Sequence, residues 1–162
     1  MITWIILAAA VVIIDQLAKL LVTANIGPMD SIHIIPGLFD FVYVENTGAA
    51  FSILSENTVF LSLISVIFCL GVCIFWYIKK PNNKLFCTSL TLLFAGALGN
   101  AIDRIFRGFV VDFISASFVT FPVFNIADIA ITGGAALLII YLLFFDKDEK
   151  DGETDSSCIK PE

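Results

Sequence analysis

Four long apolar runs dominate the chain, and each is long enough to cross a lipid bilayer, which needs about 20 residues. They predict transmembrane helices over residues 4–22, 57–78, 85–102 and 124–145. Asp15 and Lys19 interrupt the first run, and Asp128 lies near the start of the fourth. The second run contains no charge at all.

The loop between the second and third predicted helices fixes their orientation. It reads Lys79-Lys80-Pro81-Asn82-Asn83-Lys84, a short basic turn with a helix-ending proline. Lysines concentrate in the cytoplasmic loops of membrane proteins. An even number of helices then places both termini in the cytoplasm, in agreement with Lys147 and Lys150. The segments 23–56 and 103–123 are left on the outer side.

The two outer segments carry different patterns. Residues 31–35 and 39–44 look like short strands separated by Pro36-Gly37. Residues 103–123 alternate polar and bulky apolar residues, among them five phenylalanines, and predict a flap at the membrane surface. The expected fold is therefore a mainly α membrane protein of four transmembrane helices, with a small extracytoplasmic β-sheet and a juxtamembrane flap.

Composition agrees with a membrane protein. Of the 162 residues, 59% are hydrophobic and 15% charged, whereas a soluble domain carries about a quarter charged residues. Residues 146–162 hold seven acids and three lysines and so account for −4 of the net charge of −6. We expect one membrane domain over residues 1–145 and a disordered, acidic cytoplasmic tail over 146–162. No basic patch indicates nucleic-acid binding.

The cysteines do not indicate a metal site. Cys69, Cys73 and Cys87 lie in apolar runs, and Cys158 lies in the tail. His33 is the single histidine, and the cysteines lack the paired spacing of a zinc site. We interpret them as small hydrophobic residues and expect neither a metal nor another cofactor.

Polar residues near the membrane gather at one depth. Placing an ionisable group inside a bilayer costs free energy, so each such residue requires a structural or functional explanation. Counting along the predicted helices brings Asp15, Asp103, Asp112 and Asp128 to the level of the outer leaflet. The same layer contains Lys19, Asn46, Asn100, Arg104 and Asn125.

Structural interpretations remain open for most of these residues. Three pairs have the spacing of a local interaction, namely an ion pair of Asp15 with Lys19, a capping box of Asn125 with Asp128, and a salt bridge of Asp103 with Arg104. The glycines at 96, 99, 133 and 134 favour close helix packing, and residues 46–50 are compatible with an ordinary turn. These interpretations leave Asp112 without an evident partner.

Two aspartates in a partly dry site are able to share one proton. One then acts as a base toward water while the other polarises a carbonyl, which hydrolyses a peptide bond without a metal. Serine-protease chemistry is unattractive because Ser52, Ser115 and Ser117 lack a histidine base. On the residues alone, a hydrolase, a proton-coupled transporter and a small channel fit equally well.

Four ordered motifs resemble those of the lipoprotein signal peptidases (signal peptidase II). The first two are Asp15-Gln16-Leu17-Ala18-Lys19 and Asn46-Thr47-Gly48-Ala49-Ala50-Phe51-Ser52. The third runs from Gly96 to Arg104 and continues through Gly108 to Ile114. The fourth is Phe124-Asn125-Ile126-Ala127-Asp128. The resemblance covers residues 1–145.

The resemblance implies an aspartic endopeptidase of the bacterial cytoplasmic (inner) membrane, with its active site at the outer leaflet. It would remove signal peptides from diacylglyceryl-modified prolipoproteins, just before the lipidated cysteine. Expected partners are these substrates, membrane lipids and the inhibitor globomycin, and the outer sheet would resemble the family's cradle. We expect a monomer, because one chain carries every motif.

The resemblance also assigns roles to individual residues. Asp112 and Asp128 match the catalytic dyad, and Asp15 and Lys19 match a supporting site. Residues matching positions that shape the site or contact substrate are Asn46, Gly48, Asn100, Asp103, Arg104 and Asn125. The alternative of a small proton-coupled transporter or channel would use the same acids as proton carriers.

Overall fold

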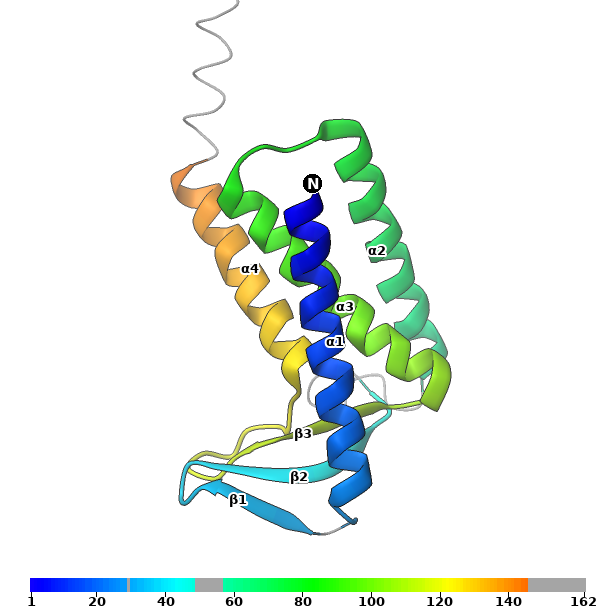
Figure 1. The fold of residues 1–162 in the computed structure, drawn as a ribbon, viewed down its shortest axis with the longest axis vertical. Coiled ribbons are helices and arrows are strands. Elements are labelled where there is room, and N and C mark those ends of the chain that lie inside the picture. The colour runs from blue at the N-terminus through cyan, green and yellow to red at the C-terminus, as the bar shows by residue number, and fades with distance from the viewer. Residues whose placement is uncertain (29, 49–56, 146–162) are drawn as a thin grey trace, which may run out of the picture.

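Four long helices pack together, and a small sheet lies across one end of them (Figure 1). The computed structural model describes residues 1–28, 30–48 and 57–145. Within these ranges the helices are α1 (Ile2–Asn25), α2 (Thr58–Lys79), α3 (Lys84–Arg107) and α4 (Ile126–Phe144). All four are long and apolar enough to span a membrane, as predicted. The tail at 146–162 lies outside the described residues, so its predicted disorder stays a prediction.

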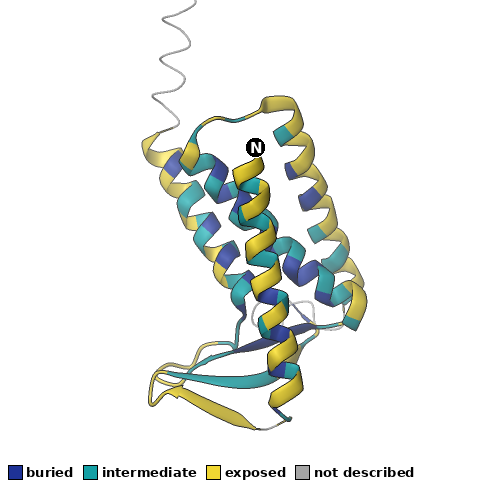
Figure 2. Cartoon of the chain, viewed as in Figure 1, coloured by how far each residue is buried: buried dark blue, intermediate teal, exposed yellow. Residues whose placement is uncertain are grey.

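Helix α3 is the centre of the bundle. It packs against α1, α2 and α4, and it carries more buried residues than any of them. The other three helices turn large apolar side chains outward, so their outer surfaces are mostly exposed (Figure 2). A continuous exposed apolar surface of this kind suits contact with lipid rather than water.

Glycines allow α3 and α4 to approach closely. A methyl group at Gly96 would collide with the backbone oxygen of Ala127, and one at Gly134 would lie 2.9 Å from the backbone of Ser89. The packing role predicted for these two glycines is therefore confirmed. The prediction is wrong for Gly133, where a methyl group would meet nothing within 4 Å, because this position faces a cavity.

The sheet contains three antiparallel strands in the order β1-β2-β3. β1 (Ser31–Ile35) and β2 (Phe39–Asn46) are the predicted pair, and Gly37 turns between them with a left-handed φ of 76°. β3 (Val110–Ala116) adds to the far edge of β2, with Asp112 opposite Val44 and Val110 opposite Asn46.

The predicted flap at 103–123 is wrong for most of its length. Helix α3 continues to Arg107 and ends at Gly108, whose φ is 84°. The alternating residues that follow form β3 instead of a separate flap. The helix continues beyond its predicted end and includes Asp103. It does so because the Asp103 side chain is buried among polar partners rather than exposed to lipid.

Apolar packing fixes the position of β3 relative to the helices. Val111 and Phe113 form a buried cluster with Val22 and Ile26 at the C-terminal end of α1. The rings of Phe113 and Phe41 meet edge to face, with their centroids 5.6 Å apart. Because successive strand residues point to opposite faces, this packing turns Asp112 toward the other side. The sheet thereby aims one carboxyl away from the apolar cluster.

The segment that joins β3 to α4 folds back onto β3 just before α4 begins. The backbone N–H of Ile114 donates to the carbonyl of Phe124 at 2.8 Å, and the N–H of Phe124 donates back at 3.1 Å. Asn125, the next residue, is the N-cap of α4. This bridge brings the start of α4 beside the strand that carries Asp112.

Candidate active site

Asp112 has two amide partners from separate elements. Asn46 Nδ2, at the end of β2, donates to one carboxyl oxygen at 2.7 Å. Asn125 Nδ2, at the cap of α4, donates to the other oxygen at 2.7 Å. Only 2% of Asp112 is exposed. The residue for which the sequence offered no partner is therefore held on both oxygens.

Asp128 lies in the first turn of α4 and completes its cap. Its backbone N–H donates to Asn125 Oδ1 at 2.9 Å, and the N–H of Asn125 donates to Asp128 Oδ2 at 3.2 Å. The predicted capping box is confirmed. The second oxygen of Asp128 accepts from Asn100 Nδ2 on α3 at 2.8 Å. Asn125 thus contacts both aspartates, one by its cap and one by its side-chain amide.

Burial raises the pKa of the Asp112 carboxyl from 3.8 to about 6. The negative charge of Asp128 adds to the rise, while the hydrogen bonds from Asn46 and Asn125 oppose it. Desolvation and a like charge both disfavour ionisation of a carboxyl. Asp112 is consequently able to hold a proton at a pH where an ordinary aspartate has lost it.

Both aspartates face one cavity of about 1080 Å³ between the end of β2, α3 and α4. Phe121, Phe124 and Ile131 supply apolar walls, and Ser65 of α2 and Gly133 of α4 extend the lining along the helices. The polar lining includes predicted site residues from the second, third and fourth motifs, namely Asn46, Gly48, Asn100, Arg104, Asp112 and Asp128.

The turn after β2 orients one of these amides. The N–H of Gly48 donates to Asn46 Oδ1 at 2.9 Å, which agrees with the turn interpretation as far as Gly48. Because the oxygen is engaged there, the Nδ2 group of Asn46 faces Asp112. The rest of the motif, residues 49–52 with Phe51 and Ser52, lies outside the described residues.

Arg104 does not pair with Asp103, so the predicted salt bridge between them is wrong. Neighbouring residues on a helix point in different directions. Arg104 Nη2 donates to the carbonyl of Gly48 at 3.1 Å. Asp103 points into the bundle instead, 2.8 Å from Lys19 Nζ and 3.5 Å from Arg107 Nε. Within the described ranges, the buried Arg104 Nε has no hydrogen-bond partner.

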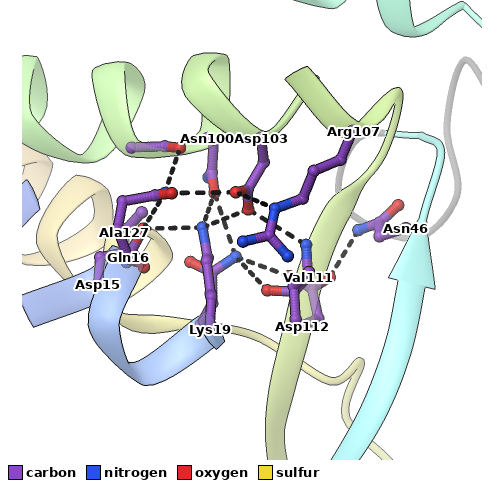
Figure 3. Close-up of polar contacts among 12 residues, drawn as sticks. Asp15, Gln16, Lys19, Asn46, Asn100, Asp103, Arg107, Val111, Asp112 and Ala127 are labelled. Atoms are coloured by element: carbon purple, nitrogen blue, oxygen red, sulfur yellow. Dashed lines mark hydrogen bonds and ion pairs between the residues drawn. The ribbon is translucent and has the colours of Figure 1, made fainter. Parts of the chain in front are cut away.

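Behind the cavity, Asp15, Lys19 and Asp103 form a buried ionic cluster (Figure 3). Lys19 Nζ lies 2.8 Å from a carboxyl oxygen of each aspartate, and none of the three residues is exposed. The predicted Asp15–Lys19 ion pair is confirmed, with Asp103 as a third member. Lys19 also donates to Asn100 Oδ1 at 3.2 Å.

The family model for signal peptidase (SPase) II matches residues 7–144, which is most of the described chain. The chain belongs to the signal peptidase II family. It is therefore a multi-pass membrane protein and an aspartic peptidase, and the transporter or channel alternative is not favoured.

Individual members of the family match over nearly their whole length. The lipoprotein signal peptidase of Lactobacillus johnsonii is 40% identical over 148 residues, which cover 91% of this chain and 95% of the relative. That of Staphylococcus aureus is 41% identical over 154 residues, covering 93% and 94%. A bacterial membrane enzyme solved by the in meso method superposes with a TM-score of 0.83 at 36% identity, covering 99% of this chain and 93% of that one.

Gln16 contacts the ionic cluster of this family member, although no role was assigned to it from the sequence. Its Nε2 lies within hydrogen-bonding distance of Asp15 Oδ2 at 3.2 Å, Asp103 Oδ1 at 3.3 Å and the Gly99 carbonyl at 3.1 Å. Its position inside the first motif, beside Asp15, was the available signal. The contact with α3 is between residues 83 or more positions apart, which helical periodicity does not reveal.

Proposed function

We propose that this chain removes signal peptides from diacylglyceryl-modified prolipoproteins, cleaving just before the lipidated cysteine with a water activated by Asp112 and Asp128. One observation carries the proposal. The two aspartates come from different elements, β3 and α4, yet Asn125 contacts both and both line one cavity. Family membership supports the substrate class, since the matching relatives are lipoprotein signal peptidases.

Asp112 holds the shared proton in the resting site, because burial favours its neutral form. Asp128 is the base, because it accepts from Asn100 and from the backbone of Asn125. Water attacks the scissile carbonyl carbon while Asp128 takes a proton from that water and Asp112 donates its proton to the carbonyl oxygen. The product of this step is a neutral tetrahedral diol.

The second step restores both carboxyls. The carbon–nitrogen bond breaks as Asp128 donates its proton to the leaving amine, and Asp112 takes a proton from one hydroxyl of the diol. Each aspartate thus ends in its starting state. The amides of Asn46 and Asn125 keep Asp112 in place through both changes of charge.

Arg104 is the candidate for binding the substrate backbone. It lines the cavity, it is partly fixed by its bond to Gly48, and its Nε lacks a partner among the described residues. A peptide carbonyl that reaches the guanidinium group as the substrate binds would satisfy this buried donor. Globomycin, as a cyclic peptide, would compete for the same space.

The proposed orientation follows from the positions of the basic loop and the cavity. The loop at 80–83 and the sheet lie at opposite ends of the bundle (Figure 1). With the basic loop and both termini in the cytoplasm, the cavity opens at the outer leaflet of the bacterial inner membrane. A lipidated substrate presents its bond at that level while its acyl chains stay among the membrane lipids. One chain supplies both aspartates, so a monomer is sufficient.

The test uses purified protein and one prolipoprotein prepared with and without its diacylglyceryl group. We expect a gel shift for the lipidated form only, a new amino terminus at the lipidated cysteine, and inhibition by globomycin. Equal cleavage of both forms would contradict the substrate assignment. No cleavage of either form by the folded protein would contradict the proposed reaction.

A further inference from the structure

The buried ionic cluster of Asp15, Lys19 and Asp103 accepts hydrogen bonds from two backbone N–H groups, one through each aspartate (Figure 3). Asp15 Oδ1 accepts from the N–H of Ala127 at 2.9 Å. Asp103 Oδ2 accepts from the N–H of Val111 at 3.2 Å. Ala127 directly precedes Asp128, and Val111 directly precedes Asp112. Each carboxylate therefore holds the peptide group next to one aspartate of the dyad.

Lys19 ties these two anchors into one unit. Its ammonium lies 2.8 Å from Asp15 and 2.8 Å from Asp103, so the two carboxylates are fixed relative to each other. Gln16 Nε2 bridges the same two side chains through Asp15 Oδ2 and Asp103 Oδ1. Charge-assisted hydrogen bonds are shorter and stronger than neutral ones. The separation of the two anchored backbones is thus set by a single cluster.

A second connection runs through side chains. Lys19 has only donors, so the group of Asn100 that faces it must be Oδ1, at 3.2 Å. The Nδ2 group of Asn100 is thereby turned to Asp128, at 2.8 Å. Lys19 consequently orients an amide that contacts Asp128 directly.

Stability alone explains the cluster poorly. A buried ion pair costs desolvation that its attraction often fails to repay, and apolar residues of similar volume frequently stabilise as well or better. The cluster also buries two carboxylates around a single buried lysine, with Arg107 reaching only one of them, at 3.5 Å. What it provides that apolar packing would not is a defined hydrogen bond to each of two backbone positions.

We propose that Asp15, Lys19, Asp103 and Gln16 are positioning residues that set the distance and orientation between Asp112 and Asp128 through the backbone N–H groups of Val111 and Ala127. The inference rests on the proposed function of the dyad. The cluster itself touches no substrate, because its three charged members are fully buried and do not line the cavity.

The primary test is Asp103→Asn, which neutralises one anchor without a change in size. We expect kcat to fall about 100-fold, as a misplacement of reacting groups by 1 Å does, with KM unchanged and a displaced pH profile. Arg107→Gln is the control, because Arg107 reaches the same carboxylate at 3.5 Å from the outer end of α3. It should keep wild-type kcat.

Gln16→Met is the second variant, and it tests the positioning role on its own if Asp103→Asn does not fold. It keeps all three charges and removes the bridge between the anchors, together with the contact to the Gly99 carbonyl. We expect kcat to fall roughly fivefold, the equivalent of one lost hydrogen bond, with KM and the melting temperature unchanged. Leu17→Met, on the exposed side of the same helix, is its control.

Wild-type kcat and pH profile in folded Asp103→Asn, or in Gln16→Met where Asp103→Asn does not fold, would overturn the positioning role. A lower melting temperature with kcat unchanged would overturn it as well, since that outcome marks a structural role only. Failure of the proposed function has a separate signature, because wild type itself would then fail to cleave or Asp112→Asn would still cleave.

Discussion

Asn125 Nδ2 lies 2.7 Å from Asp112 Oδ1, although Asn125 is also the N-cap of the helix that carries Asp128. A capping residue normally serves only its own helix. Here the oxygen of the amide closes the capping box while its nitrogen reaches a strand 13 positions earlier in the chain. The geometry of the dyad is therefore coupled to the start of α4.

This relationship separates two functions of one residue. Asn125→Ser keeps a good N-cap but loses the amide to Asp112, whereas Asn125→Ala loses both. We expect both variants to cleave poorly and only Asn125→Ala to lose stability, by about 1 kcal/mol. Initial rates and thermal unfolding in the same detergent measure the two effects. An equal loss of stability in both variants would mean that the cap and the dyad contact are not separable.

The ionic cluster predicts an order of stability among its variants. Lys19→Met leaves the buried Asp15 without a cationic partner and Asp103 with only the 3.5 Å contact to Arg107, at a cost of about 3–5 kcal/mol. Asp15→Asn keeps the Lys19–Asp103 pair and should lower stability by a smaller amount. Adding Asp15→Asn and Asp103→Asn to Lys19→Met should restore part of the stability, measured by thermal unfolding. A triple variant less stable than Lys19→Met would contradict buried charge as the cause.

The pKa of Asp112 predicts how cleavage depends on pH. As the proton donor, Asp112 must be protonated, so kcat/KM should fall as pH rises above about 6, tenfold per pH unit. A profile that is flat or rising between pH 6 and pH 8 would contradict Asp112 as the donor.

The same ionisation affects folding. Because the folded pKa of Asp112 is raised from 3.8 to about 6, its contribution to stability is complete below 3.8 and is lost as pH rises through 6. The loss amounts to about 3 kcal/mol at most. Thermal unfolding of wild type from pH 4 to pH 8 should therefore show a decline that is smaller in Asp112→Asn. An identical decline in both proteins would exclude Asp112 as its source.

Arg104 provides a prediction about substrate binding. Arg104→Lys keeps the charge but loses the planar group whose Nη2 bonds Gly48 and whose buried Nε has no partner among the described residues. We expect kcat/KM to fall about 10- to 100-fold, the value of a hydrogen bond to a charged group. Arg107→Lys, one turn further along α3, is the matched control and should retain activity. Similar losses in both variants would indicate a general effect of charge near the membrane surface.

The sequence predicted the elements whose pattern the membrane imposes. A bilayer requires long apolar helices, so all four were visible, with ends that differ by a few residues. The strands at Ser31–Ile35 and Phe39–Asn46 followed from alternation and turn residues. The third strand was missed because α3 was expected to end before its first charge. Asp103 is tolerated in the helix by partners on α1, which local sequence does not reveal.

Of the candidate site, too, the sequence predicted one part and missed another. Asp112 and Asp128 were predicted as site residues for two reasons. Placing a carboxylate in or near the bilayer costs free energy, and the motifs that contain these residues resemble those of a known family. Their hydrogen-bond partners depend on contacts between β2, β3, α3 and α4 that span 13 to 66 positions. Gln16 was missed for the same reason, since its partners lie on α3.

The most direct test of the dyad is cleavage of a diacylated prolipoprotein by Asp112→Asn and by Asp128→Asn. Asp30→Asn is the matched control, because Asp30 is an exposed aspartate in the segment that joins α1 to the sheet. Each dyad variant should accumulate in the membrane as wild type does and leave the substrate uncleaved, while Asp30→Asn cleaves normally. Retained cleavage by either dyad variant would contradict the assignment of Asp112 and Asp128 as the catalytic pair.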